Sequence, residues 1–538
     1  MTVQTSYPGI YIQELPSLVH AIIPAPTSIA VFVGYTNPFY AGTTYKVATP
    51  LNSFADYQAN FGGFFSCPWQ PDYLGQAVYQ FFQNGGPTCY VVALPAQFYY
   101  ASIGEPSLGQ IGAANVAVAA TGGTITFTAR QPVGVGTTGI SMTVVISNPQ
   151  QTSVDNDTAD VVVKYGSTAE TYRQVQIANL VTRLQPSNLV SVMVPGTVTA
   201  YVAGSSPLTY GTLAAGQIPP DPSYTVINPP DFGPVFANYA SLDKVPIFNL
   251  LATPGVSASL VTSAAVAYCE RKRAFYIMDT PSSSQPPSPA TASQPASPGW
   301  DVNSVIGVFA QSGELNPPPP VSINAAVYYP WLQTPDPVTG QTILMPPSGF
   351  VAGIYGQTDN SQGVWQSPAG LQTALTGTTG VDANGVMTDP QQGILNINAI
   401  NCLRQFPGSG TVVFGARTAA AADIAFQQWK YVAVRRMALF IEQSLYGSLG
   451  WAVFQGNAQP LWDALTQEVN AFMAGLYRQG AFAGSTPKDS FLVRCDATTT
   501  TQQDVALGVV NVLVGFAPLV PAEFVVIQIA QLAGQTQS

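Results

Sequence analysis

The chain has 538 residues, of which 46% are hydrophobic and only 8% are charged, and its net charge is −10. An ordinary soluble domain has about 25% charged residues, so the composition indicates either a surface largely covered by partners or a large β-rich extracellular protein with a neutral polar surface. The negative charge lies in residues 1–400, and residues 401–538 are neutral, which leaves no basic patch for nucleic acid or an anionic membrane.

Residues 1–22 are predicted to form an extended arm. Pro8 and Pro16 exclude a helix, whereas Ile10 and Ile12 suit a strand. The segment has neither the basic region nor the apolar region of a signal peptide, so we do not expect secretion by that route. An arm this apolar cannot bury itself, and it should pair with another chain.

Residues 23–105 are expected to be the first part of an outer α/β region. Residues 28–33 and 89–94 are typical of buried strands. Residues 72–83 have helical spacing of apolar side chains, with Asp72 as the N-cap. A strand, a helix and a further strand in this order predict a parallel sheet.

Two segments of different character follow. Residues 106–214 are rich in Thr, Val, Gly and Ser with alternating apolar positions, which predicts an inserted β-rich domain. Residues 215–390 return to an α/β pattern, with strands expected at 245–252 and 274–280. Within them, residues 281–299 are Pro- and Ser-rich and predict a disordered loop.

Residues 391–538 are expected to form an α+β domain with the longest helices, at 419–446 and 460–479, and strands at 490–495 and 505–531. Val505 to Ala522 is long and uncharged enough to span a membrane, but Pro518 and Pro521 interrupt it. Two buried strands around a proline bend are the preferred interpretation. The fold class predicted for the whole chain is α/β plus all-β, in several domains with extended terminal arms.

The sequence offers little for catalysis. His20 is the only histidine and lies in the arm, so a catalytic triad or a histidine-based zinc site lacks support. Gly134, Gly136 and Gly139 form a GxGxxG string, but a strand-like segment follows where a nucleotide site needs a helix. The five cysteines are widely spaced without a CxxC motif, which favours reduced, buried thiols. A pair of carboxylates brought together by folding is the hardest enzyme site to exclude.

A cluster of basic residues lies in the predicted helix 419–446: Lys430, Arg435 and Arg436. One interpretation is a charged face that meets an acidic partner. The other is internal ion pairing together with a solvated helix face.

Several segments, in order along the chain, resemble the contractile tail sheath proteins of phages, pyocins and extracellular injection systems. They are YPGIYIQELPS (7–17), TSIAVFVGYT (27–36), FFQNGGPTCYVVAL (81–94), YYPWLQTPDP (328–337), PPSGFVAGIYGQTDNSQGVWQSPA (346–369), GILNINAINCLRQFPGSGTVVFGART (393–418), YVAVRRMALFIEQSL (431–445), FQGNAQPLWDAL (454–465) and PLVPAEFVVIQIAQ (518–531).

The resemblance implies a subtilisin-like α/β domain without a protease site, an inserted β-domain and a C-terminal core domain at 391–538. It also implies hexameric rings stacked around an inner tube, with baseplate and cap proteins as further partners. Apolar terminal arms would add strands to neighbouring subunits. The arm residues expected from this are Tyr7, Pro8, Gly9, Ile10, Tyr11, Ile12, Glu523, Phe524, Val525, Val526, Ile527 and Ile529.

By the same resemblance, Lys430, Arg435 and Arg436 are the candidates for contact with the tube. The expected protein is structural and not an enzyme, with no cofactor, no metal, no nucleic acid and no direct membrane insertion. It would be assembled in the bacterial cytoplasm as part of a phage tail or of a tail-like particle released from the cell. The alternatives are a secreted β-rich adhesin or surface protein and an α/β hydrolase.

Overall fold

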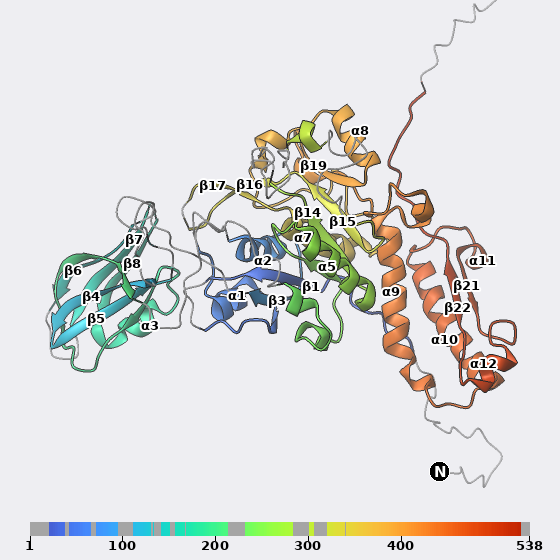
Figure 1. The fold of residues 1–538 in the computed structure, drawn as a ribbon, viewed down its shortest axis with the longest axis horizontal. Coiled ribbons are helices and arrows are strands. Elements are labelled where there is room, and N and C mark those ends of the chain that lie inside the picture. Colours follow the sequence, from blue (N-terminus) through green and yellow to red (C-terminus); the bar gives the residue numbers. More distant parts are fainter. Residues whose placement is uncertain are drawn as a thin grey trace, which may run out of the picture. The chain divides into compact units, whose positions relative to one another are not determined.

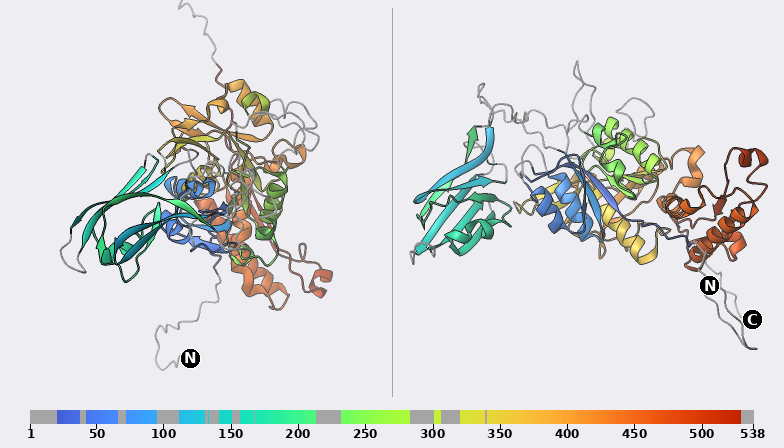
Figure 2. Two further views of the ribbon diagram at one scale, coloured as in Figure 1. Left: turned by 60° about the vertical axis from the view of Figure 1, so that its left-hand side comes forward. Right: turned by 90° about the horizontal axis from the view of Figure 1, so that it is seen from below.

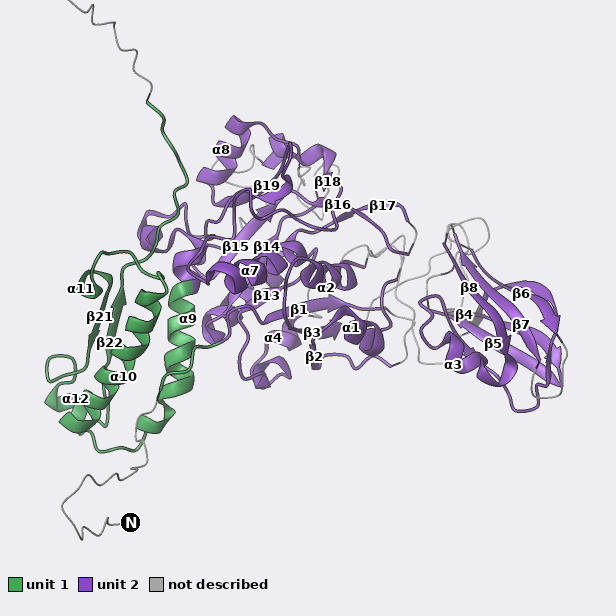
Figure 3. Ribbon diagram, turned by 180° about the vertical axis from the view of Figure 1, so that it is seen from behind, with its two compact units in different colours: residues 1–25, 437–538 green, residues 26–436 purple. Residues whose placement is uncertain are grey.

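The computed structural model describes the chain in twelve stretches: residues 21–37, 42–65, 72–94, 111–130, 133, 141–150, 157–166, 168–212, 232–282, 301–305, 320–338 and 340–528. The chain divides into two compact units, one of residues 1–25 with 437–538 and one of residues 26–436 (Figure 3). The arm residues Tyr7 to Ile12, the GxGxxG string and most of the loop 281–299 lie outside the described residues.

The unit of residues 26–436 is built around an eight-stranded sheet whose central strands are parallel (Figure 1). The strand pairs at its two ends, β2–β3 and β19–β20, are antiparallel. In spatial order the strands are β2 (Ala48–Leu51), β3 (Cys89–Leu94), β1 (Ala30–Tyr35), β13 (Leu250–Ala252), β14 (Phe275–Asp279), β15 (Ala325–Tyr329), β19 (Ile400–Phe406) and β20 (Gly410–Val413). The predicted parallel pairing of the two N-terminal strands is confirmed, because β1 and β3 pair in parallel.

Helices cover both faces of this sheet because successive side chains of a strand point to opposite sides. On one face, Phe32 of β1 packs edge-on against Phe81 of α2 (Tyr73–Gln83), and Tyr328 of β15 bonds to Tyr355 of α7 (Ser348–Gln362). On the other face, Val31 and neighbouring strand residues pack against α5 (Ser259–Lys272) and α4 (Gly233–Phe236).

Smaller elements complete the α/β part of this unit. Asp72 accepts a hydrogen bond from the Gly75 amide and caps α2, as predicted. The remaining elements are α1 (Phe54–Phe61), η3 (Leu242–Lys244), β16 (Leu332–Pro335), β17 (Thr342–Met345), β18 (Gly380–Val381), η4 (Ala383–Gly385), α8 (Asp389–Ile397) and η5 (Ile424–Trp429).

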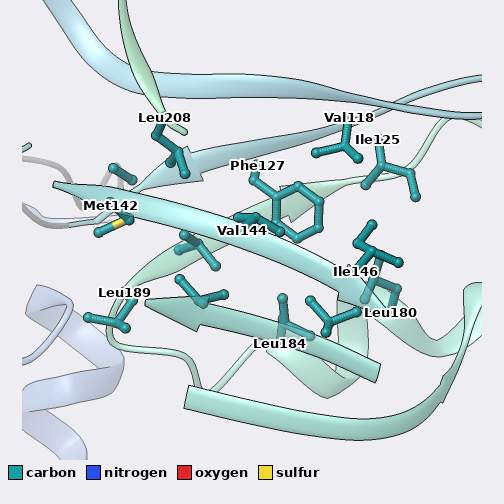
Figure 4. Close-up of a cluster of buried hydrophobic side chains, with 14 of the residues drawn as sticks. Val118, Ile125, Phe127, Met142, Val144, Ile146, Leu180, Leu184, Leu189 and Leu208 are labelled. Atoms are coloured by element: carbon teal, nitrogen blue, oxygen red, sulfur yellow. The ribbon is translucent and has the colours of Figure 1, made fainter. Parts of the chain in front are cut away.

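The described residues between 111 and 212 form two antiparallel sheets around a hydrophobic core, which Phe64 and Val338 also join and part of which is drawn in Figure 4. Phe127 lies centrally among side chains from both sheets and from α3 (Leu180–Leu184). The long strands curve around this interior in the views of Figure 2. One sheet has the strand order β10 (Ala200–Tyr201), β4 (Ile111–Thr121), β5 (Gly123–Ala129) and β9 (Val190–Met193), and β12 (Thr209–Thr212) also pairs with β4. The other sheet has the strand order β11 (Gly204–Pro207), β6 (Met142–Gln150), β7 (Thr158–Tyr165) and β8 (Thr168–Gln176).

The described residues of the unit 1–25 with 437–538 contain the C-terminal helices and one small sheet. The helix α9 (Val432–Ser448) begins in the unit of residues 26–436 and ends in this one. It is followed by η6 (Leu449–Ala452), α10 (Gln459–Arg478), α11 (Pro487–Ser490), β21 (Phe491–Arg494), α12 (Gln502–Ala506) and β22 (Leu513–Phe516). The chain is therefore a mixed α/β protein with several sheets, as predicted.

Two predicted elements are wrong in part. The helix expected at 419–446 is interrupted, because residues 424–429 form a 3-10 helix in which Phe426 leaves helical geometry, and α9 starts only at Val432. The two buried strands expected within Val505 to Ala522 are also wrong, because Val505 lies in α12 and only residues 513–516 of that stretch pair as a strand. Leu507 and Val520 of this stretch are exposed. No described helix is long and apolar enough to cross a membrane.

Candidate functional site: an open two-stranded sheet and an exposed tail

Strands β21 and β22 form an antiparallel pair, with Phe491 opposite Phe516 and Arg494 opposite Leu513. Neither strand has a second ladder partner among the described residues, so each has one open edge. A strand edge with unpaired amide and carbonyl groups is a template for a further strand. This small sheet is thus able to accept strands on either side.

One face of the small sheet is held by packing. Phe482 is buried and its ring contacts the rings of Phe491 and Phe516. Leu492 alternates with these residues and is about half exposed, as is Leu513 on the facing strand. The packed face fixes the sheet on its own unit, while the open edges and outward side chains stay accessible.

The chain after β22 is extended and unusually apolar for an exposed segment. Phe524 is 73% exposed, and the following three side chains, Val525, Val526 and Ile527, are each 80 or 81% exposed. Burying a side chain of this kind is worth about 1.5–3 kcal/mol, so four in a row make a strong driving force for docking. The described part of the tail, 517–528, has no strand pairing beyond one bridge between Phe482 and Pro518. Ile529 lies outside the described residues.

The candidate tube-contact residues do not form one cationic face. Lys430 lies before α9 and its ammonium is over the ring of Tyr431. The guanidinium of Arg435 lies over the ring of Trp429, and its Nε donates to Asn324. These two side chains are partly buried.

Arg436 is buried, with 3% of its side chain exposed, against 1% for its partner Asp359. Its two terminal nitrogens donate to the two carboxylate oxygens of Asp359 at 2.8 and 2.6 Å. The guanidinium also lies over the ring of Tyr355. Burial lowers the pKa of Arg436, but the Asp359 carboxylate raises it. The net effect is a rise, so the guanidinium stays charged. A buried, bidentate guanidinium cannot reach an outside partner in this structure, so Arg436 is removed from the candidate contacts, and internal ion pairing is its observed role.

A buried Asp–Ser pair, which the sequence analysis missed, lies at the carboxyl end of β14. The Asp279 carboxylate accepts hydrogen bonds from the Ser348 amide and hydroxyl and from the Gly255 amide, at 2.8, 2.7 and 3.0 Å. Burial raises the pKa of Asp279 to about 7, against the lowering effect of these donors. Asp279 lies one residue before the end of the strand predicted at 274–280, and Ser348 precedes an apolar run, which are the signals that could have indicated the pair.

This pair does not have the arrangement of a hydrolase centre. Ser348 and Asp279 are both inaccessible to solvent and bond to each other directly, with no imidazole between them. His20 lies outside the described residues. No group of three metal-ligating side chains occurs in the described part of the chain. The Asp279 carboxyl group instead accepts from the first amide of α7 and so satisfies one of the unpaired donors at the start of that helix.

Comparisons with known proteins agree on one family. Residues 240–419 match the domain described as the phage tail sheath protein central domain. A Pseudomonas aeruginosa (strain UCBPP-PA14) protein named as a prophage major tail sheath protein is 27% identical over 295 residues, which cover 53% of this chain and 66% of that relative.

Solved structures of contractile sheaths have the same fold. The chain is 22% identical to the sheath of the extracellular contractile injection system PVC in its contracted state, with a TM-score of 0.55 over 98% of this chain and 99% of that one. The helical sheath of the anti-feeding prophage in its contracted state gives the same values. The resemblance to contractile tail sheath proteins is therefore confirmed.

Proposed function

We propose that this protein, which carries a tail sheath central domain, is the structural subunit of a contractile sheath. It polymerises as stacked hexameric rings around an inner tube and contracts to drive the tube through a target envelope. The observation that carries the proposal is that one unit holds both an exposed apolar tail, 524–527, and an open two-stranded sheet, within a chain that has the sheath fold.

Assembly would proceed by strand addition between subunits. The tail Glu523–Ile529 of one subunit, and the arm Tyr7–Ile12 of another, would pair with the open edges of β21 and β22. Main-chain hydrogen bonds of this kind give affinity, and alternate side chains give specificity. The outward side chains Leu492 and Leu513 would then cover part of the apolar surface of the added strands.

Contraction would use the difference in free energy between two lattices. Because the arms are connected to neighbours through strands, subunits can rotate outward while the mesh stays linked. The extended lattice would be a kinetically trapped state, released when a contact at one end is lost. No nucleotide or cofactor enters this scheme, and energy is supplied at assembly.

The α/β unit would have a structural role in a subtilisin-like architecture without peptidase activity. Support comes from the open, mostly parallel sheet with helices on both faces and from the closed Asp279–Ser348 pair. The fold of a hydrolase does not carry its chemistry, which depends on the site. We therefore propose that the protein is not an enzyme.

The proposed partners are further copies of this chain, an inner tube protein, and baseplate and cap proteins. Contact with the tube by Lys430 and Arg435 remains part of the proposal. The particle would be assembled in the bacterial cytoplasm and act as a phage tail or a released tail-like particle.

Negative-stain electron microscopy of the purified protein, alone and with its tube protein, tests the proposal. We expect long hollow cylinders with a ring repeat, which disappear when residues 1–17 or 523–538 are deleted. A monodisperse monomer under both conditions would contradict the proposal and favour the adhesin or hydrolase alternatives.

A further inference from the structure

The segment that precedes β1 is stiffened by its own sequence. Residues 22–27 read Ile-Ile-Pro-Ala-Pro-Thr, and the prolines at 24 and 26 fix their own backbone and push Ile23 and Ala25 toward extended conformations. Between residues 23 and 26 the prolines leave only two amide hydrogens, those of Ile23 and Ala25.

Both amides are bound by serines of α9. The Ile23 amide donates to the Ser448 hydroxyl oxygen at 3.0 Å, and the Ala25 amide donates to that of Ser444 at 2.9 Å. The Ser444 hydroxyl in turn donates to the Phe440 carbonyl at 2.7 Å, which orients its oxygen toward the amide.

The spacing of these contacts matches two regular structures. Ser444 and Ser448 are one helical turn apart, about 6 Å along the axis. Two residues of polyproline II structure advance about 6.2 Å. The segment thus runs antiparallel to α9, and one of its amides is bound at each helical turn. A flexible linker would not be expected to have this regular spacing of contacts.

The next two carbonyls of the segment are held in the unit of residues 26–436. Asn249 donates from its side-chain amide to the Pro26 carbonyl at 2.7 Å and accepts from the Ile29 amide at 3.0 Å. Arg436 donates from Nη2 to the Thr27 carbonyl at 2.9 Å, and the same Nη2 also donates to Oδ2 of Asp359. Arg436 is itself a residue of α9, so this hydrogen bond joins the segment to the helix that also carries the two serines.

We propose that residues 22–27 are a pre-organised tether that ties the N-terminal segment 1–20 to α9 and to the buried Arg436–Asp359 pair. The proposal rests on the function proposed above, in which residues 7–12 join a neighbouring copy. A force that pulls on residues 7–12 then acts directly on α9 and on the ion pair, because residues 22–27 are already extended and held. The buried pair suits this role, because breaking a buried ion pair leaves an uncompensated charge and is strongly destabilising.

Hydrogen exchange of the full, dispersed chain, resolved to single amides by mass spectrometry, tests the tether. In the wild type the amides of Ile23 and Ala25 should exchange at least 100-fold more slowly than in an unstructured peptide. The double variant Ser444→Ala/Ser448→Ala should remove most of this protection. Ser361→Ala is the matched control, because Ser361 bonds only to carbonyls of its own helix and should leave both amides unchanged. Peptide-like exchange in the wild type, or an unchanged double variant, overturns the tether.

A second variant tests the link to the ion pair. Arg436→Lys keeps the charge but replaces the planar two-nitrogen fork that holds both Asp359 oxygens and the Thr27 carbonyl by a single ammonium, so the Ala25 amide should exchange at least tenfold faster although Ser444 is intact. No change there overturns the link.

Load is tested on assembled cylinders by the urea concentration at which they dissociate. Ser444→Ala/Ser448→Ala should lower this urea concentration relative to wild type and Ser361→Ala, and an equal value overturns the role of the tether in transmitting force. Failure of the wild type to form cylinders contradicts the proposed function instead, and exchange in the dispersed chain still decides the tether.

Discussion

The hydroxyl of Ser348 donates to the carboxylate of Asp279 at 2.7 Å, deep in the α/β unit and at the first residue of α7. The same carboxylate accepts two main-chain amides, so it ties the helix to the ends of two strands. A geometry that resembles part of a hydrolase site thus serves as a structural cap.

Stability of the dispersed chain should fall as the pH rises from about 4 to 7. Burial raises the pKa of Asp279 to about 7 from an ordinary value of 3.8, so the folded state holds a proton in this window that the unfolded state has lost. The contribution of Asp279 to stability is fully present below 3.8, the pKa of the group in the unfolded chain. It is lost as the pH rises through about 7, the pKa in the folded chain. Each pKa unit corresponds to about 1.4 kcal/mol.

Melting temperatures measured from pH 4 to 8 check this effect. Asp279→Asn should show a weaker decline than the wild type across the window. Asp72→Asn provides a comparison. Burial raises the pKa of Asp72 to about 8, so this variant should lose the part of the wild-type decline in melting temperature that extends to higher pH. An identical slope in the wild type and in Asp279→Asn would disprove the assignment.

Removing one member of the Arg436–Asp359 pair should destabilise the chain far more than removing both. Arg436→Met leaves a buried carboxylate without its partner, which typically costs about 3–5 kcal/mol. The double variant Arg436→Met/Asp359→Leu leaves no buried charge and should recover most of that loss. Urea denaturation of the wild type, Arg436→Met, Asp359→Leu and the double variant measures these losses, and a loss in the double variant equal to the sum of the two single losses would show that the pair is not coupled.

Close contact between helices α2 and α7 requires glycine. A Cβ atom at Gly353 would lie 2.6 Å from the Cβ of Asn84 and 2.8 Å from the carbonyl oxygen of Phe81. Gly353→Ala should therefore destabilise by about 1–3 kcal/mol through overpacking. Gly393→Ala in α8 is the matched control, since nothing lies within 4 Å of its Cβ and the change should be neutral or stabilising. Equal losses in both variants would refute the packing argument.

The sequence predicted the α/β elements well where two signals agreed. Residues 72–83 had both helical apolar spacing and an N-cap, and the helix found is Tyr73–Gln83 with Asp72 as its cap. The strand predicted at 89–94 is β3, Cys89–Leu94. In these segments local propensity and burial in the sheet favour the same structure.

Elsewhere the pattern was misleading for physical reasons. Residues 419–446 have helical spacing throughout, but Asp423 caps a short 3-10 turn and the main chain of Lys430 bonds to Thr418, which breaks the helix. Val-rich residues 505–520 suggested buried strands, although a capping box at Thr501 starts a helix there. The partner of Arg436 could not be predicted, because Asp359 is 77 positions away.

A charge placed in the tail should block assembly without unfolding the chain. Val526 is almost fully exposed, so Val526→Lys should leave the melting temperature unchanged, yet a lysine cannot be covered by a neighbouring sheet without loss of hydration. Leu507→Lys is the control, since Leu507 is also exposed but lies outside the tail. Sedimentation after mixing with the tube protein measures polymer, and cylinders formed equally by Val526→Lys would contradict a role for the tail.

Cross-linking between the tail and the small sheet tests the central claim most directly. Cysteines would be placed at Val526 with Leu492, or at Val526 with Leu513, and treated with a short bismaleimide before and after polymerisation. The described native cysteines, Cys89, Cys269, Cys402 and Cys495, are buried and should not react.

Strand exchange between subunits predicts a ladder of covalent multimers beyond the dimer. The ladder should appear only in polymerised samples with both cysteines and be absent from the single-cysteine controls. Cylinders that give no ladder with either pair, or a product confined to single chains, would contradict the account.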